Sequence, residues 1–416
     1  MTPQEHPLLK RVAAAIPLWL VVAGCAPPAA VRRDVGARAI PKLEVTKGPT
    51  TGSAPPSTTR TAVALPDNQT PHDRALAVQV GVGAYHSCAL FSDGSISCWG
   101  NNSEGQLGDG TKSPSRAPAK VVGLGRATAV VGGNAHTCAL LESGQVACWG
   151  SNAEGQLGDG TNDQRLRPVL VAGLDAAIAL TAGSDRTCAI LASGRVSCWG
   201  DSSGLPLGDG PKNGKREPSP IPRLSEVTAL SAGHGHTCAA SGSGVVQCWG
   251  FNGCHQLGDG TKQRRGLPVP VTGLTNVVAL GAGGQNTCAI LRDGRVKCWG
   301  QLGSVGSVQV RPTLVEGLSE VMALGAGYLT TCALSRDGQV KCWGLTGQTG
   351  PNTFTFSTTP MPIALSEVVS ISAGYGHRCA VTRSGEVQCW GFNEDGQLGD
   401  ISIEASFTPI SVKFPR

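Results

Sequence analysis

Pairs of cysteines with nine residues between them recur seven times in this chain, and Trp-Gly follows the second cysteine of every pair. The pairs are Cys88 with Cys98, Cys138 with Cys148, Cys188 with Cys198, Cys238 with Cys248, Cys288 with Cys298, Cys332 with Cys342, and Cys379 with Cys389. Each pair begins about 50 residues after the one before, a period typical of repeat architectures. A chain of 416 residues could hold two or three unrelated domains, but this period favours a single repeat fold with a large shared core.

Each repeat contains four short segments in which apolar and polar residues alternate, and glycines separate these segments. In one typical stretch the segments lie at 267–274, 277–283, 287–294 and 295–300. Alternation with a period of two over such lengths predicts β-strands. The sequence therefore predicts an all-β protein with four strands in each repeat.

A tight turn is predicted between the two cysteines of every pair. A glycine follows the first cysteine by six residues in all seven repeats, and Asp or Ser always precedes that glycine. This composition is typical of a three-residue hairpin loop closed by a glycine with positive φ. With Ser92, Asp93 and Gly94 as the loop, Cys88 faces Cys98. The Cα atoms of directly opposed residues in a non-hydrogen-bonded pair lie within the distance that a disulfide accepts.

The repeats are therefore expected to carry one hairpin disulfide each. Zinc is the rival interpretation of paired cysteines, but structural zinc usually takes cysteines about two to four residues apart with a second ligand pair nearby. We therefore expect no metal. The tryptophan after each second cysteine points to the opposite face of its strand, where it would fill the interface between neighbouring sheets.

Residues 1–24 are predicted to be a lipoprotein signal peptide. Lys10 and Arg11 precede an apolar run at 12–23, which is too short to span a bilayer comfortably and has the length of an export-signal core. The run ends in Val-Val-Ala-Gly-Cys, which resembles a bacterial lipobox and implies cleavage before Cys25 and lipidation of that cysteine. An ordinary cleaved signal or a short membrane anchor is the alternative. Ala26 resembles the residue that follows the cysteine in lipoproteins sent to an outer membrane.

Residues 25–74 are rich in Pro, Ala, Thr, Arg and Ser without apolar periodicity, so they are predicted to form a flexible, lipid-anchored linker. No second apolar run of spanning length follows, and lipid would be the only membrane attachment. Residues 75–416 hold the seven repeats. Export also supplies the oxidising compartment that disulfides need. We therefore expect the protein in the bacterial cell envelope, at the periplasmic face or the cell surface.

The charge of the chain argues against a nucleic-acid partner. The net charge is +5, but the first 75 residues contain nine Lys and Arg against five Asp and Glu. The remainder contains 25 against 24 and is nearly neutral. Nucleic-acid binders need a basic face that neutralises phosphates. We therefore expect no nucleic acid among the partners.

The repeat resembles that of the regulator of chromosome condensation family. The shared pattern is Ala-Gly-x-x-His-Thr-Cys-Ala-Leu, followed by Asp/Ser-Gly-x-Val-x-Cys-Trp-Gly-x-Asn-x-x-Gly-Gln-Leu-Gly. The second part is matched most fully at 100–111, 150–161 and 391–400, whereas the fifth and sixth repeats lack the Gly-Gln-Leu-Gly loop. The resemblance covers about residues 75–416 and implies a seven-bladed β-propeller of four-stranded blades. We also expect the two chain ends to complete one blade together, because the chain begins with a first strand and ends with a proline-led segment.

Strand direction alternates within each four-stranded repeat, so the loop between strands one and two (the first connection) and the loop between strands three and four (the third connection) lie on the same rim. All three tyrosines fall in first connections. They belong to repeats one, six and seven, which are neighbours once the ring closes. We predict a ligand-binding surface on this rim, because exposed aromatic clusters are typical of protein-binding sites. Packing onto loop backbone or filling the channel mouth is the alternative. The candidate residues are Tyr85, Tyr328, Tyr375, Phe392 and Phe251, with Phe354 and Phe356 nearby.

Three other groups of residues could carry chemistry but receive structural interpretations. Histidines recur two residues before the first cysteine in four repeats, and we expect loop hydrogen bonds to backbone rather than a metal ring. Aspartates of the Leu-Gly-Asp-Gly loops offer too few oxygens for calcium and are expected to bond their own turns. Cys254, beside His255, is expected to be an inert thiol or a link to another molecule rather than a nucleophile. The histidines are His86, His136, His236 and His377, and the aspartates are Asp109, Asp159, Asp209 and Asp259.

Three function classes follow from these features. We expect a monomeric, non-enzymatic interaction module without cofactors, which binds a protein or glycan at the envelope. The resemblance implies two particular activities: a secreted propeller of this type inhibits β-lactamases through aromatic loops, and the founding eukaryotic member exchanges nucleotide on a small GTPase. An export signal argues against the second, because such GTPases are cytosolic. An envelope enzyme is the third class, but no nucleophile, base and orienting group occur in one recognisable motif.

Overall fold

The computed structural model describes residues 75–174, 176–201, 215–302, 307–350, 353–400 and 402–415. The predicted signal peptide, Cys25 and the predicted linker lie outside these residues. The described segments contain strands, turns and bends. Among them, no helix has the length and apolar character needed to cross a lipid bilayer.

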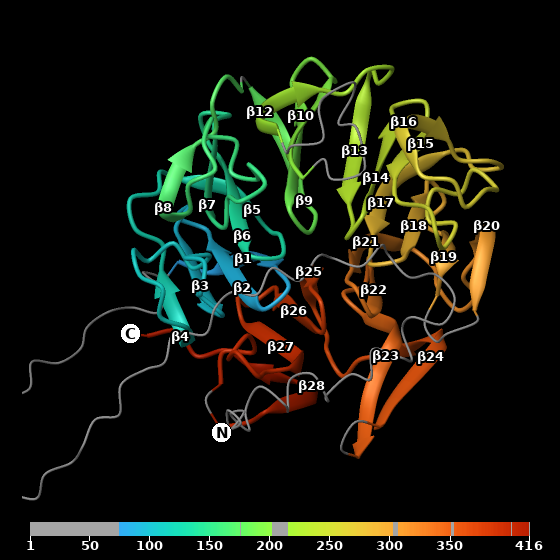
Figure 1. Cartoon of the computed structure of the whole chain (residues 1–416). Coiled ribbons are helices and arrows are strands. Elements are labelled where there is room, and N and C mark those ends of the chain that lie inside the picture. The colour runs from blue at the N-terminus through green and yellow to red at the C-terminus, as the bar shows by residue number, and fades with distance from the viewer. Residues whose placement is uncertain are drawn as a thin grey trace, which may run out of the picture. The chain divides into compact units, whose positions relative to one another are not determined.

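The strands form seven antiparallel sheets of four strands, and each sheet uses four strands that are consecutive in the chain (Figure 1). Blades one and two contain β1 (Ala77–Val82), β2 (His86–Phe91), β3 (Ile96–Gly100), β4 (Ser115–Lys120), β5 (Ala127–Gly132), β6 (His136–Leu141), β7 (Val146–Gly150) and β8 (Arg165–Leu170). Blades three and four contain β9 (Ala177–Ala182), β10 (Arg186–Leu191), β11 (Val196–Gly200), β12 (Lys215–Pro220), β13 (Val227–Ala232), β14 (His236–Ser241), β15 (Val246–Gly250) and β16 (Arg265–Pro270).

Blades five to seven follow the same pattern. They contain β17 (Val277–Ala282), β18 (Asn286–Leu291), β19 (Val296–Gln301), β20 (Val308–Leu314), β21 (Val321–Ala326), β22 (Thr330–Ser335), β23 (Val340–Gly350), β24 (Thr353–Pro362), β25 (Val368–Ala373), β26 (His377–Thr382), β27 (Val387–Phe392) and β28 (Ala405–Ser411). The sixth repeat, which lacks the Gly-Gln-Leu-Gly loop, pairs its two long outer strands instead. The predicted seven-bladed all-β propeller is confirmed.

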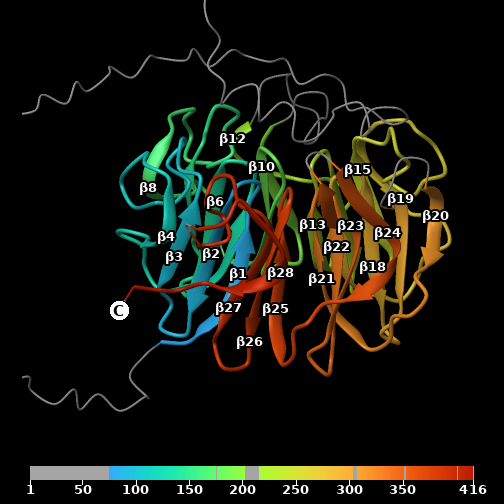
Figure 2. The ribbon, with the colours of Figure 1, turned by 90° about the horizontal axis from the view of Figure 1, so that it is seen from below.

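The first strand of every blade lies at the centre of the ring. These innermost strands contact one another in order, and the series closes where β25 meets β1. In the view of Figure 2, blade one and the last blade lie side by side, and the strands of both run along the ring axis. The ring therefore closes between a blue and a red blade that are the most distant parts of the repeat region in sequence.

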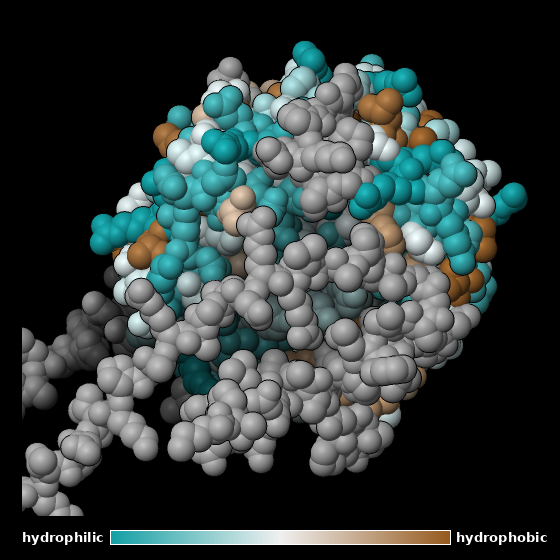
Figure 3. Space-filling model, viewed as in Figure 1, coloured by the Kyte–Doolittle hydropathy of each residue, from teal (hydrophilic) through white to brown (hydrophobic). Residues whose placement is uncertain are grey.

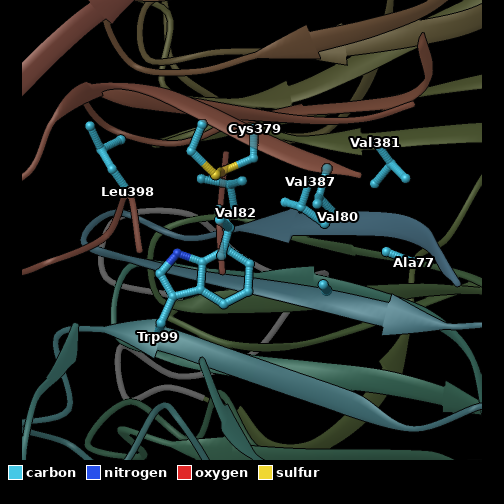
Figure 4. Packing of buried hydrophobic residues seen from close by; sticks show 11 residues of the cluster. Ala77, Val80, Val82, Trp99, Cys379, Val381, Val387 and Leu398 are labelled. Atoms are coloured by element: carbon cyan, nitrogen blue, oxygen red, sulfur yellow. A yellow bond between two sulfur atoms is a disulfide. The ribbon is translucent and has the colours of Figure 1, made fainter. Parts of the chain in front are cut away.

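The expectation that the chain ends share one blade is wrong. The first strand pairs within blade one, and the last strand pairs within blade seven. Each repeat already contains all four strands in chain order, so neither end lacks a strand. Side chains close the ring instead: Trp99, Val381 and Leu398 belong to one buried cluster across the joint (Figure 4). Phe414 adds to it, with its ring centroid 5.8 Å from that of Trp99.

The hairpins follow the predicted register. Cys88 lies opposite Cys98, and the backbone N–H of Phe91 donates to the carbonyl oxygen of Ser95 at 2.9 Å. Gly94 has a φ of 79°, as the loop type requires. The predicted three-residue hairpin loop is therefore present.

All seven predicted cysteine pairs form disulfides, with Cα atoms 4.0–4.1 Å apart. The two cysteines of each pair lie directly opposite each other on the second and third strands of their blade. The bonds join Cys88 to Cys98, Cys138 to Cys148, Cys188 to Cys198, Cys238 to Cys248, Cys288 to Cys298, Cys332 to Cys342, and Cys379 to Cys389. The prediction of one hairpin disulfide in each blade is confirmed.

The tryptophans after the second cysteines fill the joints between blades, as expected. All seven are 0–2% exposed. Trp149 of blade two packs in one cluster with Cys88 and Cys98 of blade one, and the same arrangement recurs at every joint. Each disulfide therefore staples its own hairpin and also provides the apolar surface that receives the tryptophan of the next blade.

Seven glycines allow the innermost strands to approach one another at the rim of the first connections. A Cβ atom placed on any of them would lie 1.9–2.7 Å from the carbonyl oxygen of the next glycine, which is closer than van der Waals contact allows. The glycines are Gly83, Gly133, Gly183, Gly233, Gly283, Gly327 and Gly374. The diameter of the central opening at this rim therefore depends on the absence of side chains.

We predict that Gly374→Ala destabilises the propeller, because the new methyl group would lie 1.9 Å from the carbonyl oxygen of Gly83 across the closing joint. The free energy of unfolding, measured by urea denaturation, should fall by about 1–3 kcal/mol or more. Gly125→Ala is the matched control, since its Cβ would meet only a Leu141 methyl group at 3.9 Å. Equal stabilities of the two variants would contradict the prediction.

Candidate functional site

The first connections converge on one opening of the central channel. Residues from the ends of all seven innermost strands and from the following turns line this opening. The third connections emerge on the same rim, because strand direction alternates in each sheet. The structure thus brings segments from seven distant parts of the chain around one mouth.

The three tyrosines gather at this mouth, as the sequence predicted. Tyr328 and Tyr375 stack with ring centroids 4.5 Å apart and an interplanar angle of 17°. Tyr85 continues the series, with its centroid 5.8 Å from that of Tyr375. His234 packs edge-on against Tyr328 at 5.1 Å. We call these four residues the mouth array.

His234 was missed by the sequence analysis, although a signal for it exists. It occupies a first connection, which is the segment that carries all three tyrosines. It comes from blade four, whereas Tyr328 comes from blade six. The Tyr328 ring passes over Gly284 of blade five, where a Cβ would lie 2.6 Å from a ring carbon. The missing side chain lets Tyr328 extend across blade five to His234.

The mouth array is partly exposed and its tyrosines are neutral at physiological pH. Tyr85 is 41% exposed, and Tyr328 and Tyr375 are half-buried. Burial, followed by the neighbouring Tyr375, raises the pKa of Tyr85 and of Tyr328 to about 12. Burial also raises the pKa of Tyr375. The rings therefore offer aromatic faces and hydroxyl groups, and not phenolates, to a ligand.

The predicted phenylalanines do not join the mouth array directly. Phe392 packs edge-on against Phe354 and Phe407, with centroids 5.6 and 5.8 Å apart. Its ring lies against the backbone beside the array, since a Cβ on Gly376, next to Tyr375, would lie 2.3 Å from it. Phe251 makes no ring contact with another aromatic residue of the described segments, so the structure does not bring it to the tyrosines.

Phe251 packs on loop backbone: a Cβ on Gly253 of its own loop would lie 2.6 Å from its ring, and a Cβ on Gly235, next to His234, would lie 3.1 Å from its Cβ. This is the packing onto loop backbone that was the alternative to binding. The hydrophobic surface is otherwise scattered: on the face seen in Figure 3, the coloured surface is mainly hydrophilic, with separate brown patches near its edge. The mouth array is therefore the candidate that the contacts support best.

The recurring histidines join neighbouring blades below the rim, which corrects the expectation of a hydrogen bond to loop backbone. His86 Nε2 lies 2.8 Å from the Thr137 hydroxyl of blade two. That hydroxyl donates its only proton to the Gln106 carbonyl at 2.8 Å, so His86 must be the donor to Thr137. Trp149 donates to the same carbonyl at 2.8 Å. The same contact recurs at three further joints, between His136 and Thr187, His236 and Thr287, and His377 and Ser87.

These histidines are neutral in the folded protein. Burial lowers the pKa of His86 to about 4, and burial lowers the pKa values of His136, His236 and His377 to about 3. A proton on Nδ1 would be buried without an acceptor, because this atom makes no hydrogen bond with the described residues in any of the four.

Other residues replace histidine where the repeats depart from the pattern. Asn286 donates to the Thr331 hydroxyl at 3.0 Å and thus makes the same joint. At the next joint a small Thr330 faces a large Arg378, which donates to the Thr330 hydroxyl and to the Leu345 carbonyl oxygen. Burial lowers the pKa of Arg378 to about 10. The arginine thus fills the space that the short side chain and the altered sixth repeat leave.

The remaining candidates have structural roles. Asp109 Oδ1 accepts from the backbone N–H of Thr111 at 2.9 Å, and Asp159 and Asp259 do the same in their own turns, as predicted. Asp209 lies outside the described residues. Within the described ranges, no three His, Cys, Asp or Glu side chains are grouped as a metal site requires.

Cys254 belongs to none of the seven disulfides and is 0% exposed. Its backbone N–H donates to Gln256 Oε1 at 2.9 Å, and its Sγ lies 3.7 Å from Gln301 Oε1. A thiol without exposed surface cannot reach another molecule, so the interpretation as an intermolecular link is wrong. The buried position agrees with an inert thiol.

The described residues thus define a disulfide-stapled propeller with an aromatic group at one mouth of its channel. Comparison with known families identifies the class of repeat. Residues 48–347 match the model of the RCC1-like domain, and residues 368–397 match the regulator of chromosome condensation (RCC1) repeat. The chain belongs to the RCC1-like domain family, which confirms the resemblance seen in the repeat motifs.

Solved structures with the same fold agree. Yeast RCC1 (Prp20), in a crystal structure with Kap60, has a TM-score of 0.67 and 21% identity over 86% of this chain and 91% of that chain. Prp20p from Saccharomyces cerevisiae, described with its binding to Gsp1p and histones, has values of 0.68 and 22% over 82% and 87%. Human WBSCR16 has values of 0.68 and 21% over 77% and 94%. At these identities the likeness establishes the fold alone.

We predict that His136→Asn reduces the dependence of stability on pH. The folded pKa of His136 is about 3 and the unfolded value is about 6.5, so the unfolded chain binds more protons between these values. The stabilising contribution is complete above pH 6.5 and is lost as the pH falls toward 3. Asn286 shows that asparagine can make the same joint.

Urea denaturation from pH 7 to pH 4 should give a slope of unfolding free energy against pH that is smaller in the variant by about 1 kcal/mol per pH unit. The comparison with wild type cancels the contribution of the carboxylates. An unchanged slope would show that His136 is protonated in the folded protein or solvated at the joint.

Proposed function

We propose that this protein is a non-enzymatic interaction module of the cell envelope that binds a protein partner, or a glycan of the envelope, through the mouth array. The observation that carries the proposal is the stack of Tyr328 on Tyr375 with Tyr85 beside it. Three partly exposed tyrosines from separate blades form one surface, and aromatic residues of this kind dominate the binding energy of protein interfaces. An inhibitor or scaffold acts by such binding without turnover.

The fold supports this class of function. An RCC1-like propeller fits an interaction module or a guanine-nucleotide exchange role, and Prp20p is described with its binding to Gsp1p and histones. Exchange on a small GTPase is therefore the second candidate for this chain. An exported location favours the interaction module, because GTPases of this kind act in the cytosol. Catalysis by an envelope enzyme is the weakest candidate, since the mouth array offers neutral tyrosines and no activated nucleophile.

The envelope location rests on two features of the sequence. Residues 1–24 have the charge and apolar pattern of an export signal, and Cys25 ends the lipobox-like motif. Seven disulfides in the described region agree with export, because hairpin disulfides persist in oxidising compartments. We propose that the lipid on Cys25 is the attachment to the membrane, that residues 25–74 are a linker, and that the propeller is a monomer.

We predict that replacing Tyr328 and Tyr375 together by alanine abolishes partner capture. Crosslinking pulldown from intact envelopes with the purified protein should recover a discrete partner, and the double variant should bind it at least about 30-fold more weakly. Ile178→Ala with Met322→Ala is the matched control. These side chains are 58% and 54% exposed at the starts of two inner strands, near the opposite rim, which carries the cysteine hairpins and is called the hairpin rim. Unchanged capture by the tyrosine variant would contradict the proposal, and nucleotide-sensitive capture of a GTPase would favour exchange.

We predict that Cys25→Ser abolishes membrane attachment without changing the propeller. Wild-type protein produced with labelled palmitate should carry the label and sediment with membranes, whereas the variant should carry none, because lipid transfer needs the thiol. Wild-type protein that lacks the label and remains soluble would contradict lipidation of Cys25.

A further inference from the structure

Carboxylate groups flank the mouth array at its Tyr85 end. The backbone N–H of Asn101 donates to the Tyr85 carbonyl oxygen at 2.9 Å, and the Asn101 side-chain amide donates to Asp395 at 2.8 Å. Asn101 thus holds the third connection of blade seven beside the first connection of blade one. Glu394, which precedes Asp395, is exposed on this connection. The contact places two acidic side chains next to the most exposed tyrosine of the array.

The carboxylates at this end of the array act on Tyr85 and on one another in the same direction. The rise in the pKa of Tyr85, which burial causes first, is increased by Tyr375, Asp395 and Glu394. The pKa of Glu394 is also raised, first by burial and then by Asp395 and Glu404. Each of these charged neighbours is negative. A cation would therefore relieve repulsion that the folded protein otherwise retains.

The opposite end of the array carries charges of both signs: burial and then Arg186 lower the pKa of His234, and Asp201 acts against them. Ser184 forms a 2.5 Å hydrogen bond with the imidazole of the array, and Asp185 follows it in the chain. Burial raises the pKa of Asp185 to about 6, with Asp201 and Glu154 acting in the same direction and Arg186 against them. The carboxylates at this end are accompanied by Arg186, so the Tyr85 end of the array is the better site for a cation.

Aromatic faces beside carboxylates attract one class of side chain. A guanidinium group stacks on an aromatic face and pairs with a carboxylate through a planar set of donors, and it is more weakly hydrated than an ammonium group. We propose that the mouth array binds an arginine side chain of the partner, which stacks on the exposed face of Tyr85 and pairs with Glu394 and Asp395. This inference rests on the proposed protein-binding function and specifies the chemistry that the partner presents.

The test uses the full-length protein and an acetylated hexa-arginine peptide, with binding measured by titration calorimetry at low salt. Glu394→Gln combined with Asp395→Asn should raise the Kd at least fivefold, and the amides preserve side-chain size and an acceptor for Asn101. Asp293→Asn combined with Asp337→Asn is the matched control, since it removes the same charge from exposed sites on the hairpin rim. The control should change the Kd less than twofold.

A second probe separates stacking from general charge attraction. A hexa-lysine peptide, which keeps the charge but not the planar group, should bind at least fivefold more weakly than hexa-arginine. Tyr85→Leu should also raise the Kd for hexa-arginine at least threefold, because it removes the aromatic face and leaves both carboxylates. Equal effects of the mouth and control charge variants, or no effect of either, would overturn the arginine site.

The two proposals fail in different ways. The tyrosine double variant could lose its envelope partner while the carboxylate variant binds hexa-arginine with an unchanged Kd. In that case the protein-binding proposal stands and the arginine inference is wrong. If the tyrosine double variant captures the partner normally, the proposed function itself falls.

Discussion

The interlocking of each tryptophan with the disulfide of the preceding blade supports the rest of the structure. A disulfide alone would staple one hairpin, and a tryptophan alone would fill one gap. Adjacent residues on a strand, such as Cys148 and Trp149, point to opposite faces and so link three successive blades. Seven such links close the ring between β25 and β1 without a shared strand. Third connections add to four of these joints through a buried leucine each, namely Leu107, Leu157, Leu257 and Leu398, and are thereby held in place by the core.

Features that depend on neighbouring residues were predictable from the sequence. The hairpin register, the disulfides and the burial of the tryptophans follow from turn composition and a period of two, which are local. The prediction that the chain ends share one blade failed because the first and last repeats were each interpreted as lacking a strand. Each of them contains all four strands. The histidine prediction failed because its partner, such as Thr137 for His86, lies 51 residues away in the next repeat. A hint was present, since His and Thr adjoin in the same motif.

The candidate site was only partly predictable for the same reason. Ring closure makes repeats one, six and seven neighbours, and this was enough to bring the tyrosines together. The sequence places His234 in a first connection, but its contact with Tyr328 also depends on the missing side chain of Gly284 in the intervening blade. Phe251 was grouped by its position in a connection, but its ring lies against its own loop. The direction of a side chain at a loop is set by packing that the sequence alone does not display.

The contacts between blades bear on how such a ring can evolve. Four joints use the same exchange, in which a histidine on one blade meets a hydroxyl on the next. Deletion of blade two would place His86 beside Thr187 and form an equivalent joint. These contacts therefore do not determine the number of blades. The pair of Thr330 and Arg378 differs, because a short side chain on one blade is compensated by a large one on the next. Recombination between repeats is therefore tolerated chemically through much of the ring, but it is disfavoured at the joint between blades six and seven.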